Sequence, residues 1–148
     1  MRLLIQRVTK ASVRVNEKTV GSIDKGALIF IGIKSTDTKA QADWLMAKIK
    51  SLHMMPDADG QTKYTLEDAN AQLLLVSQFT LYANCAHGSR PSYSDAMAGA
   101  QAQELYDYMV FTLGKMFPGK VQTGIFAAYM HVELENDGPY TLLLEKEV

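Results

Sequence analysis

The sequence predicts a single α/β domain over residues 1–148, with a mixed, largely antiparallel β-sheet and two main helices packed outside it. Three observations lead to this fold class. The 148-residue length fits one domain with one core. Strand-like segments dominate both ends of the chain, and the connections between the first four are short enough to require antiparallel pairing for most of them. In the middle, two stretches carry apolar residues at helical spacing.

The first 33 residues contain four expected strands. Arg2–Thr9 is rich in aliphatic residues, and Ser12–Asn16 alternates between apolar and polar side chains. Lys18–Ile23 forms a short third strand. Ala27–Ile33 is an uninterrupted apolar run, which is typical of a strand buried on both faces.

Two helices are expected, one after these strands and one before the C-terminal strands. The first has an apolar stripe over Ala42–Leu52. Its N-cap can be Thr36, Asp37 or Thr38, and Thr38 with Gln41 has capping-box spacing. The second covers about Asp95–Met116, and Pro118–Gly119 ends it.

The remaining strands lie between the helices and at the C-terminal end. One is expected over Gln72–Tyr82, and three more over Val121–Phe126, Tyr129–Glu135 and Tyr140–Glu145. Asn136–Pro139 has the composition of a tight turn, so we expect it to separate the last two strands.

Charge and cysteine content limit the function classes and the compartment. With 15 basic and 16 acidic residues the net charge is −1, which argues against a broad basic face for nucleic acid but leaves room for a local contact with an RNA end. Cys85 is the only cysteine, so no intrachain disulfide forms, and the first residues contain no secretory h-region. We therefore expect a cytoplasmic protein without a membrane span.

Two residue pairs offer familiar catalytic chemistry. His131 and Glu133 lie two apart on an expected strand, so both side chains can face one metal ion, but two ligands do not make a site. Cys85 and His87 suggest a thiolate–imidazole pair, although a lone cysteine is more often inert. We expect neither site, and no metal or other cofactor; a cysteine- or metal-dependent hydrolase remains a third hypothesis.

Two polar segments are harder to assign. Ser77-Gln78-Phe79-Thr80 places polar side chains at the end of an apolar strand, where an unpaired buried polar atom costs about 1–3 kcal/mol. Taken by itself, this segment is better explained by solvation at a strand end than by a functional role. The composition of Asn136–Thr141 is typical of a hairpin turn.

In combination, these segments resemble the D-aminoacyl-tRNA deacylase family along essentially the whole chain. Met1–Val8 and Ala11–Val13 match the opening of that family. Ser77–Leu81, with the sequence SQFTL, is identical to its most recognisable motif. Asn136–Thr141, with the sequence NDGPYT, fits its second motif.

Two further stretches add to the resemblance. Gly88–Tyr93 fits a linking loop, and Phe126 with Met130 fits a Gly-x-Phe-x-Ala-x-Met stretch. Ala127 stands where the pattern has glycine. If this backbone has a positive φ, or if the substrate passes close by, the extra methyl group narrows the pocket.

The resemblance implies an activity and an assembly. Members of the family hydrolyse the ester that links a D-amino acid to the 3′-terminal adenosine of tRNA, accept glycyl-tRNA and spare L-aminoacyl-tRNA. The implied fold is a half-barrel homodimer in which a cis Gly-Pro pair enters the pocket of the other subunit. For this chain, the resemblance implies that Gly138 and Pro139 form this chiral gate against Ser77–Thr80 of the partner subunit, and that Arg7 clamps the inserted loop.

The same resemblance assigns roles within the site. Phe79 and Thr80 are assigned to catalysis. Substrate binding is assigned to Ser77, Gln78, Arg7, Phe126 and Met130.

This assignment is chemically consistent. Rigid main-chain carbonyl groups can accept hydrogen bonds from the α-ammonium group and exclude an L side chain, while glycine has nothing to exclude. The tRNA 2′-hydroxyl can activate water, and N–H groups near Phe79 and Thr80 can stabilise the oxyanion. Thr80 as a covalent nucleophile is the alternative mechanism, which we disfavour because no histidine or lysine is evidently placed to activate it. The alternative function is a non-catalytic dimeric tRNA-binding module.

Overall fold

The computed structural model describes the whole chain, residues 1–148. In chain order its elements are β1 (Arg2–Val15), β2 (Lys18–Ile23), β3 (Gly26–Gly32), α1 (Lys39–Ser51), β4 (His53–Pro56), β5 (Thr62–Thr65), β6 (Gln72–Ser77), the 3₁₀ turn η1 (Phe79–Tyr82), α2 (Gly99–Met116), β7 (Val121–Thr123) and β8 (His131–Glu145).

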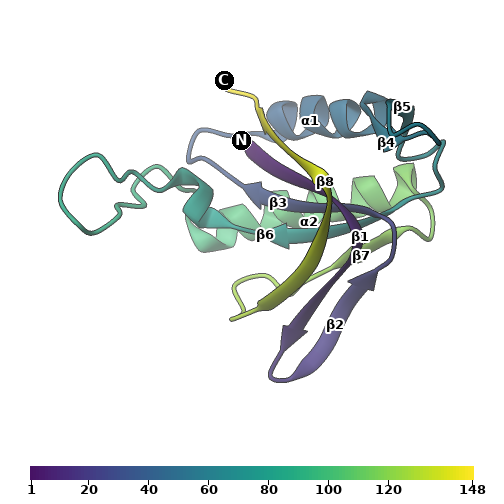
Figure 1. The fold of residues 1–148 in the computed structure, drawn as a ribbon. Helices are drawn as coiled ribbons and strands as arrows, with labels where there is room; N and C mark the ends of the chain where they lie inside the picture. The colour runs from purple at the N-terminus through teal and green to yellow at the C-terminus, as the bar shows by residue number, and fades with distance from the viewer.

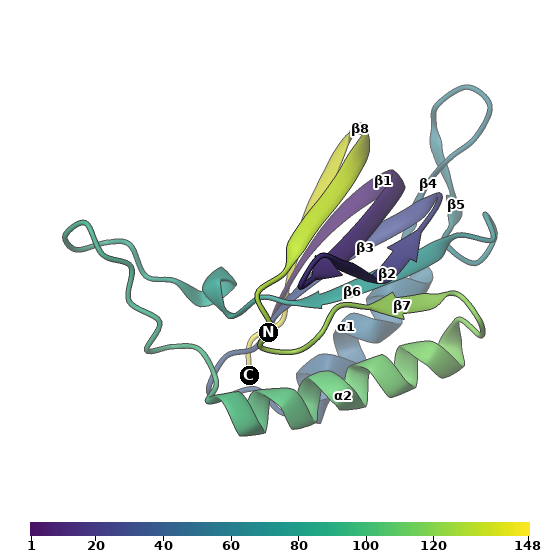
Figure 2. The same ribbon diagram turned by 90° about the horizontal axis from the view of Figure 1, so that it is seen from below.

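The main sheet is mixed, as the sequence predicted. Its strands follow the order β2-β1-β3-β6-β7, and β8 pairs with β1. Strand β1 is antiparallel to β2, β3 and β8, whereas β6 is parallel to both β3 and β7. The sheet curls into a half-barrel, and both helices lie on its outer face (Figures 1 and 2). The long loop between η1 and α2 extends away from this body (Figures 1 and 2).

Two apolar cores hold the sheet. The larger one lies between the sheet and the helices, where Ile5 and Ile29 pack in the same cluster as Leu45 of α1 and Met109 of α2. The smaller one lies on the other face and includes Leu28. Strand β3 therefore contributes to both cores, as its continuous apolar sequence predicted. Each fully buried aliphatic side chain contributes about 1.5–3 kcal/mol to folding.

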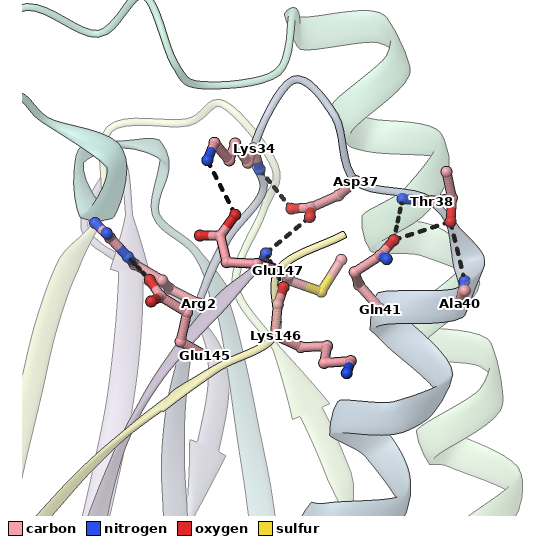
Figure 3. Close-up of polar contacts among 10 residues, drawn as sticks. Arg2, Lys34, Asp37, Thr38, Ala40, Gln41, Glu145, Lys146 and Glu147 are labelled. Atoms are coloured by element: carbon pink, nitrogen blue, oxygen red, sulfur yellow. Dashed lines mark hydrogen bonds and ion pairs between the residues drawn. The ribbon is translucent and has the colours of Figure 1, made fainter.

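The N-terminus of α1 forms as predicted. Thr38 is its N-cap: the Thr38 hydroxyl accepts a hydrogen bond from the Ala40 amide at 3.2 Å, and the Gln41 side chain accepts one from the Thr38 amide at 2.8 Å (Figure 3). Helix α2 begins at Gly99, four residues later than expected. Asp95–Met97 instead pairs with the chain that follows β3, where the Met97 amide donates to the Ile33 carbonyl at 2.9 Å.

Two expected breaks between strands are absent, so these predictions were wrong. Strand β1 continues through residues 10–11, and β8 continues through Asn136–Pro139, where a tight turn was expected. The two strands pair with each other over most of their length, with register shifts between Gln6 and Lys10. Lys10 and Ala11 pair in register with Glu135 and Leu134, whereas residues 137–140 form a bulge in β8; pairing on either side of this bulge holds the two strands together.

Two strands end earlier than predicted. Strand β6 stops at Ser77 rather than at Tyr82, and β7 stops at Thr123 rather than at Phe126. The β4–β5 hairpin was not predicted at all. Neither helix is long and apolar enough to cross a membrane.

Candidate active site

A cavity of about 520 Å³ opens where β6 ends. Its walls come from β3, from Ser77–Phe79, from the start of α2 and from the segment Phe126–Val132. Most of the lining side chains are apolar, and none carries a charge. A charged substrate group that enters this cavity must therefore find its polar partners on main-chain atoms or on another molecule, because an unpaired buried charge is very unfavourable.

Five of the predicted site residues line this cavity. They are Ser77, Gln78, Phe79, Phe126 and Met130. Four others do not line it: Thr80, Arg7, Gly138 and Pro139. The predicted site is thus divided into two parts within one chain, a cavity and a separate Gly-Pro loop.

The turn η1 forms the rim of the cavity. The Phe79 ring is 56% exposed and contacts the Tyr93 ring edge to face, with the ring centroids 5.0 Å apart. The Gln78 side chain does not cap the turn; its amide donates a hydrogen bond to the Thr80 hydroxyl at 2.6 Å. At the start of a helical turn, the N–H groups of Phe79 and Thr80 have no acceptor within the turn. They are therefore free to bind a ligand oxygen.

The reason for the early end of β6 is local. The Gln78 amide still donates to the Ile31 carbonyl at 2.8 Å, and the chain then bends over Gly32. A Cβ atom at Gly32 would lie 2.7 Å from Cβ of Leu81. The turn can pack onto β3 only because this position has no side chain.

The segment after β7 forms the opposite wall. Ala127 has a φ of 63°, the positive φ at which its methyl group was expected to narrow the pocket. The Phe126 ring packs against Tyr106, with the ring centroids 5.6 Å apart. The Tyr106 hydroxyl donates to the Leu75 carbonyl at 3.1 Å, and burial raises the pKa of Tyr106 to about 12. Tyr106 is therefore a neutral hydrogen-bond donor at neutral pH and holds Phe126 against β6.

The Gly-Pro loop is a bulge of residues 137–140 in β8. Pairing with β1 is interrupted between Asn136 and Thr141, and the Gly138–Pro139 peptide bond is cis. The Asn136 side chain closes the base of the bulge, because it accepts from the Tyr140 amide at 2.9 Å and donates to the Tyr140 carbonyl at 3.0 Å. Gly138 and Pro139 themselves are exposed.

Arg7 holds this loop from below and is 6% exposed. It donates to the carbonyl groups of Asp137 and Met54, each at 2.9 Å. Its guanidinium group also lies 4.5 Å from the centroid of the Tyr140 ring and 3.4 Å from the Asp137 carboxylate. Within this chain, Arg7 therefore fixes the base of its own Gly-Pro loop.

Replacing Arg7 is expected to destabilise the protein. Arg7→Ala leaves the buried Met54 carbonyl without a partner, so we expect the free energy of unfolding to fall by about 2 kcal/mol. Urea denaturation measures this change. The control is Arg14→Ala, which removes an exposed ion pair to Glu133 and should change stability by less than about 0.5 kcal/mol. Equal effects for the two variants would contradict the assignment of Arg7 as the support of the loop.

Sequence reasoning missed several residues of the site. Met97 lines the cavity through a pairing that no local pattern signals, because its partner strand lies more than 60 residues away. Tyr129 also lines it and lies between two motif residues, so the motif itself could have indicated it. Cys85 and His87 are exposed, and the His131 ring contacts the Tyr129 ring.

Solved structures share this fold. A structure described as "Structural Analysis of a probable eukaryotic D-amino acid tRNA deacylase" has the same fold, with a TM-score of 0.85, 16% identity and coverage of 97% of both chains. Another, described as "c-Myc DNA Unwinding Element Binding Protein", has a TM-score of 0.94 and 34% identity over 100% of both chains. Both solved structures therefore share the fold of this chain over nearly its whole length.

The sequence comparisons give the family. Residues 4–145 match the D-Tyr-tRNA(Tyr) deacylase family. The chain is 46% identical to the D-aminoacyl-tRNA deacylase of Thermosipho melanesiensis, covering 99% of this chain and 98% of that one. It is 49% identical to the enzyme of the same name from Cellvibrio japonicus, covering 97% and 98%. The chain therefore belongs to the D-Tyr-tRNA(Tyr) deacylase family and is a hydrolase that acts on aminoacyl-tRNA, as the resemblance in sequence indicated.

Proposed function

We propose that this deacylase recognises the handedness of the amino acid with main-chain atoms that a second copy of the chain supplies. In the proposed homodimer, Gly138 and Pro139 of each subunit enter the cavity of the other. D-aminoacyl-tRNA and glycyl-tRNA are hydrolysed, and L-aminoacyl-tRNA is rejected. One observation carries this proposal: the cavity and the Gly-Pro loop are both fully formed, but they do not meet within one chain.

The cavity supports a gate made of carbonyl groups. An aminoacyl ester carries an α-ammonium group, and the cavity has no charged side chain to pair with it. Carbonyl groups of the inserted loop supply the missing acceptors. Because the ammonium group is held there, one direction from Cα points at the loop, and an L side chain in that direction collides with it. Glycine has only hydrogen at that place and is admitted.

The hydrogen bonds that hold the Gly-Pro loop support the same proposal. A steric gate excludes the wrong enantiomer only if it cannot move aside. Residues 137–140 are held by the Asn136 side chain at the base of the bulge and by the buried Arg7 of β1. Two independent anchors on a loop whose tip is exposed are what such a gate requires.

The chemistry we propose uses the substrate and the main chain. Water attacks the ester carbonyl, and the oxyanion that forms accepts hydrogen bonds from the N–H groups of Phe79 and Thr80. The bond from the carbonyl carbon to the 3′-oxygen then breaks, the 3′-oxygen takes up a proton, and the free amino acid leaves. The neighbouring 2′-hydroxyl of the tRNA orients the water and relays the proton, since no acidic or basic side chain lines the cavity.

The Thr80 hydroxyl is expected to be dispensable. Its hydrogen-bond partner is the Gln78 amide, which is not a base, so nothing activates Thr80 as a nucleophile. Thr80→Val should therefore keep kcat for D-Tyr-tRNA within about fivefold of the wild type, in contrast to the losses of about a millionfold typical of a removed nucleophile. Single-turnover assays measure this. Loss of nearly all hydrolysis, together with a trapped acyl-enzyme in the wild type, would contradict the water mechanism.

Release of D-tyrosine from D-Tyr-tRNA tests the proposed function. We expect multiple turnovers with D-Tyr-tRNA and Gly-tRNA and none with L-Tyr-tRNA. Full activity in EDTA and in Cys85→Ala would eliminate a metal- or cysteine-dependent hydrolase. Binding of tRNA without turnover would instead favour the dimeric tRNA-binding module. The substrate, the 3′ end of an aminoacylated tRNA, also places the enzyme in the cytoplasm in this proposal.

A further inference from the structure

Arg2 connects the first residues of β1 to the rim of the cavity. Its guanidinium group donates a hydrogen bond to the Leu81 carbonyl at 2.8 Å and lies 4.6 Å from the centroid of the Tyr82 ring. Leu81 and Tyr82 are the last two residues of η1, the turn that presents Phe79 and Thr80. One side chain thus contacts two consecutive residues of the turn.

The end of η1 needs such a partner. The last carbonyl groups of a helical turn have no donor within the turn, and one of them, that of Leu81, is bound by Arg2. A hydrogen bond from a charged donor is stronger than one from a neutral donor. The Tyr82 ring is 4% exposed, and it presents its face to the guanidinium group. Arg2 therefore restrains both the main chain and a side chain of the turn.

Arg2 is itself held in place by the sheet. Its Cα pairs with Gly32 of β3 on one side and with Glu145 of β8 on the other. The Glu145 carboxylate accepts a hydrogen bond from Arg2, as Figure 3 shows, and this contact raises the pKa of the guanidinium group. Gly32 is also the position over which the turn bends. Arg2 and Gly32, which pair with each other in the sheet, therefore both contact η1: Gly32 packs beneath it, and Arg2 binds its last residues.

We propose that Arg2 is a positioning residue that holds η1 so that the N–H groups of Phe79 and Thr80 face the oxyanion. This inference rests on the proposed function of these two groups. Arg2 does not line the cavity, so it acts through the turn and not on the substrate. Its loss should therefore slow the chemical step and leave substrate affinity unchanged.

The test compares Arg2→Gln with the control Lys50→Gln. Lys50 lies on α1, does not line the cavity and forms an exposed ion pair with Glu67 at 3.5 Å. Both variants lose one positive charge and one ion pair, so the change in net charge is the same in both. We expect Arg2→Gln to lower kcat about tenfold with KM within about twofold, because small displacements of catalytic groups are costly. Lys50→Gln should change neither, and Arg2→Lys, which keeps a charged donor, should recover part of kcat.

Each other outcome is decisive. An unchanged kcat in Arg2→Gln, or a raised KM with unchanged kcat, overturns the inference while the proposed function stands. If kcat falls only because less of the protein is folded, as the urea midpoint of unfolding would show, the inference is also overturned. If the wild type releases no D-tyrosine, the proposed function itself fails. Amide chemical shifts of Phe79–Leu81 provide a readout without activity: they should move in Arg2→Gln and not in Lys50→Gln, and unmoved shifts overturn the inference.

Discussion

Gly138→Ala is expected to lower kcat/KM for D-Tyr-tRNA by about a hundredfold or more while the protein stays folded. Gly138 has a φ of +155°, a conformation that side chains rarely adopt. A Cβ atom there would lie 2.5 Å from the Tyr140 amide nitrogen, so the loop must shift. Asn136 and Arg7 hold both sides of the loop, and the shift therefore falls on the exposed tip. The carbonyl groups that we assign to the gate are then displaced from the positions in which they bind the α-ammonium group.

Gly60→Ala is the matched control for this variant. Gly60 also has a positive φ, of +80°, but it lies in an exposed turn with no atom within 4 Å of a Cβ atom placed there. Both substitutions force a side chain into a positive-φ conformation, at a cost of about 1–3 kcal/mol, but only at Gly138 does the new Cβ atom meet neighbouring atoms, and only Gly138→Ala should affect deacylation. Steady-state assays with D-Tyr-tRNA, together with urea denaturation, separate the two effects. Activity of Gly138→Ala equal to that of Gly60→Ala would show that the loop has no part in the reaction.

Phe79→Pro is expected to lower kcat by about 10²–10³-fold relative to Phe79→Ala, the loss typical of removing one oxyanion donor. Both variants lose the aromatic ring, and only proline also loses the main-chain N–H group. The fold should tolerate proline here because Phe79 is the first residue of η1 and is exposed. Proline is favoured at the first position of a helical turn.

The two variants differ in the main-chain N–H group and in the proline ring, which fixes φ of residue 79 at about −65°. A further check is KM, which should be similar in both, because the oxyanion forms only in the transition state. Circular dichroism and urea denaturation establish that both are folded. If the two variants have the same kcat, the amide of Phe79 does not stabilise the oxyanion, and the chemical part of the account must be replaced.

Local patterns in the sequence predicted local structure well. The capping box of Thr38 and Gln41 was predicted because its two hydrogen bonds join residues three positions apart. The burial of β3 on both faces followed from its continuous apolar sequence. The residues Ser77–Phe79 were placed in the site through the resemblance to a family, and they line the cavity.

Features that depend on distant partners could not be predicted from such patterns. The end of β6 is determined by Gly32, which lies 45 positions before Ser77. The course of β8 through Asn136–Pro139 depends on pairing with β1 at the other end of the chain. Asn and Gly in that segment were interpreted as a turn because a bulge and a turn use the same residues. The sequence analysis linked Arg7 to the loop. Its hydrogen bond to the Met54 carbonyl could not be predicted, because strand β4, which contains Met54, was not predicted.

Mixing two inactive variants tests the central claim most directly. Gly138→Ala lacks the gate and keeps the cavity, whereas Phe79→Pro keeps the gate and lacks the oxyanion donor. Each alone should be nearly inactive. If the gate acts across the dimer, co-refolding equal amounts yields mixed dimers with one complete site each, and about a quarter of the wild-type rate should return. If the mixture is no more active than the average of the two variants, the gate and the cavity act within one chain, and the account is contradicted.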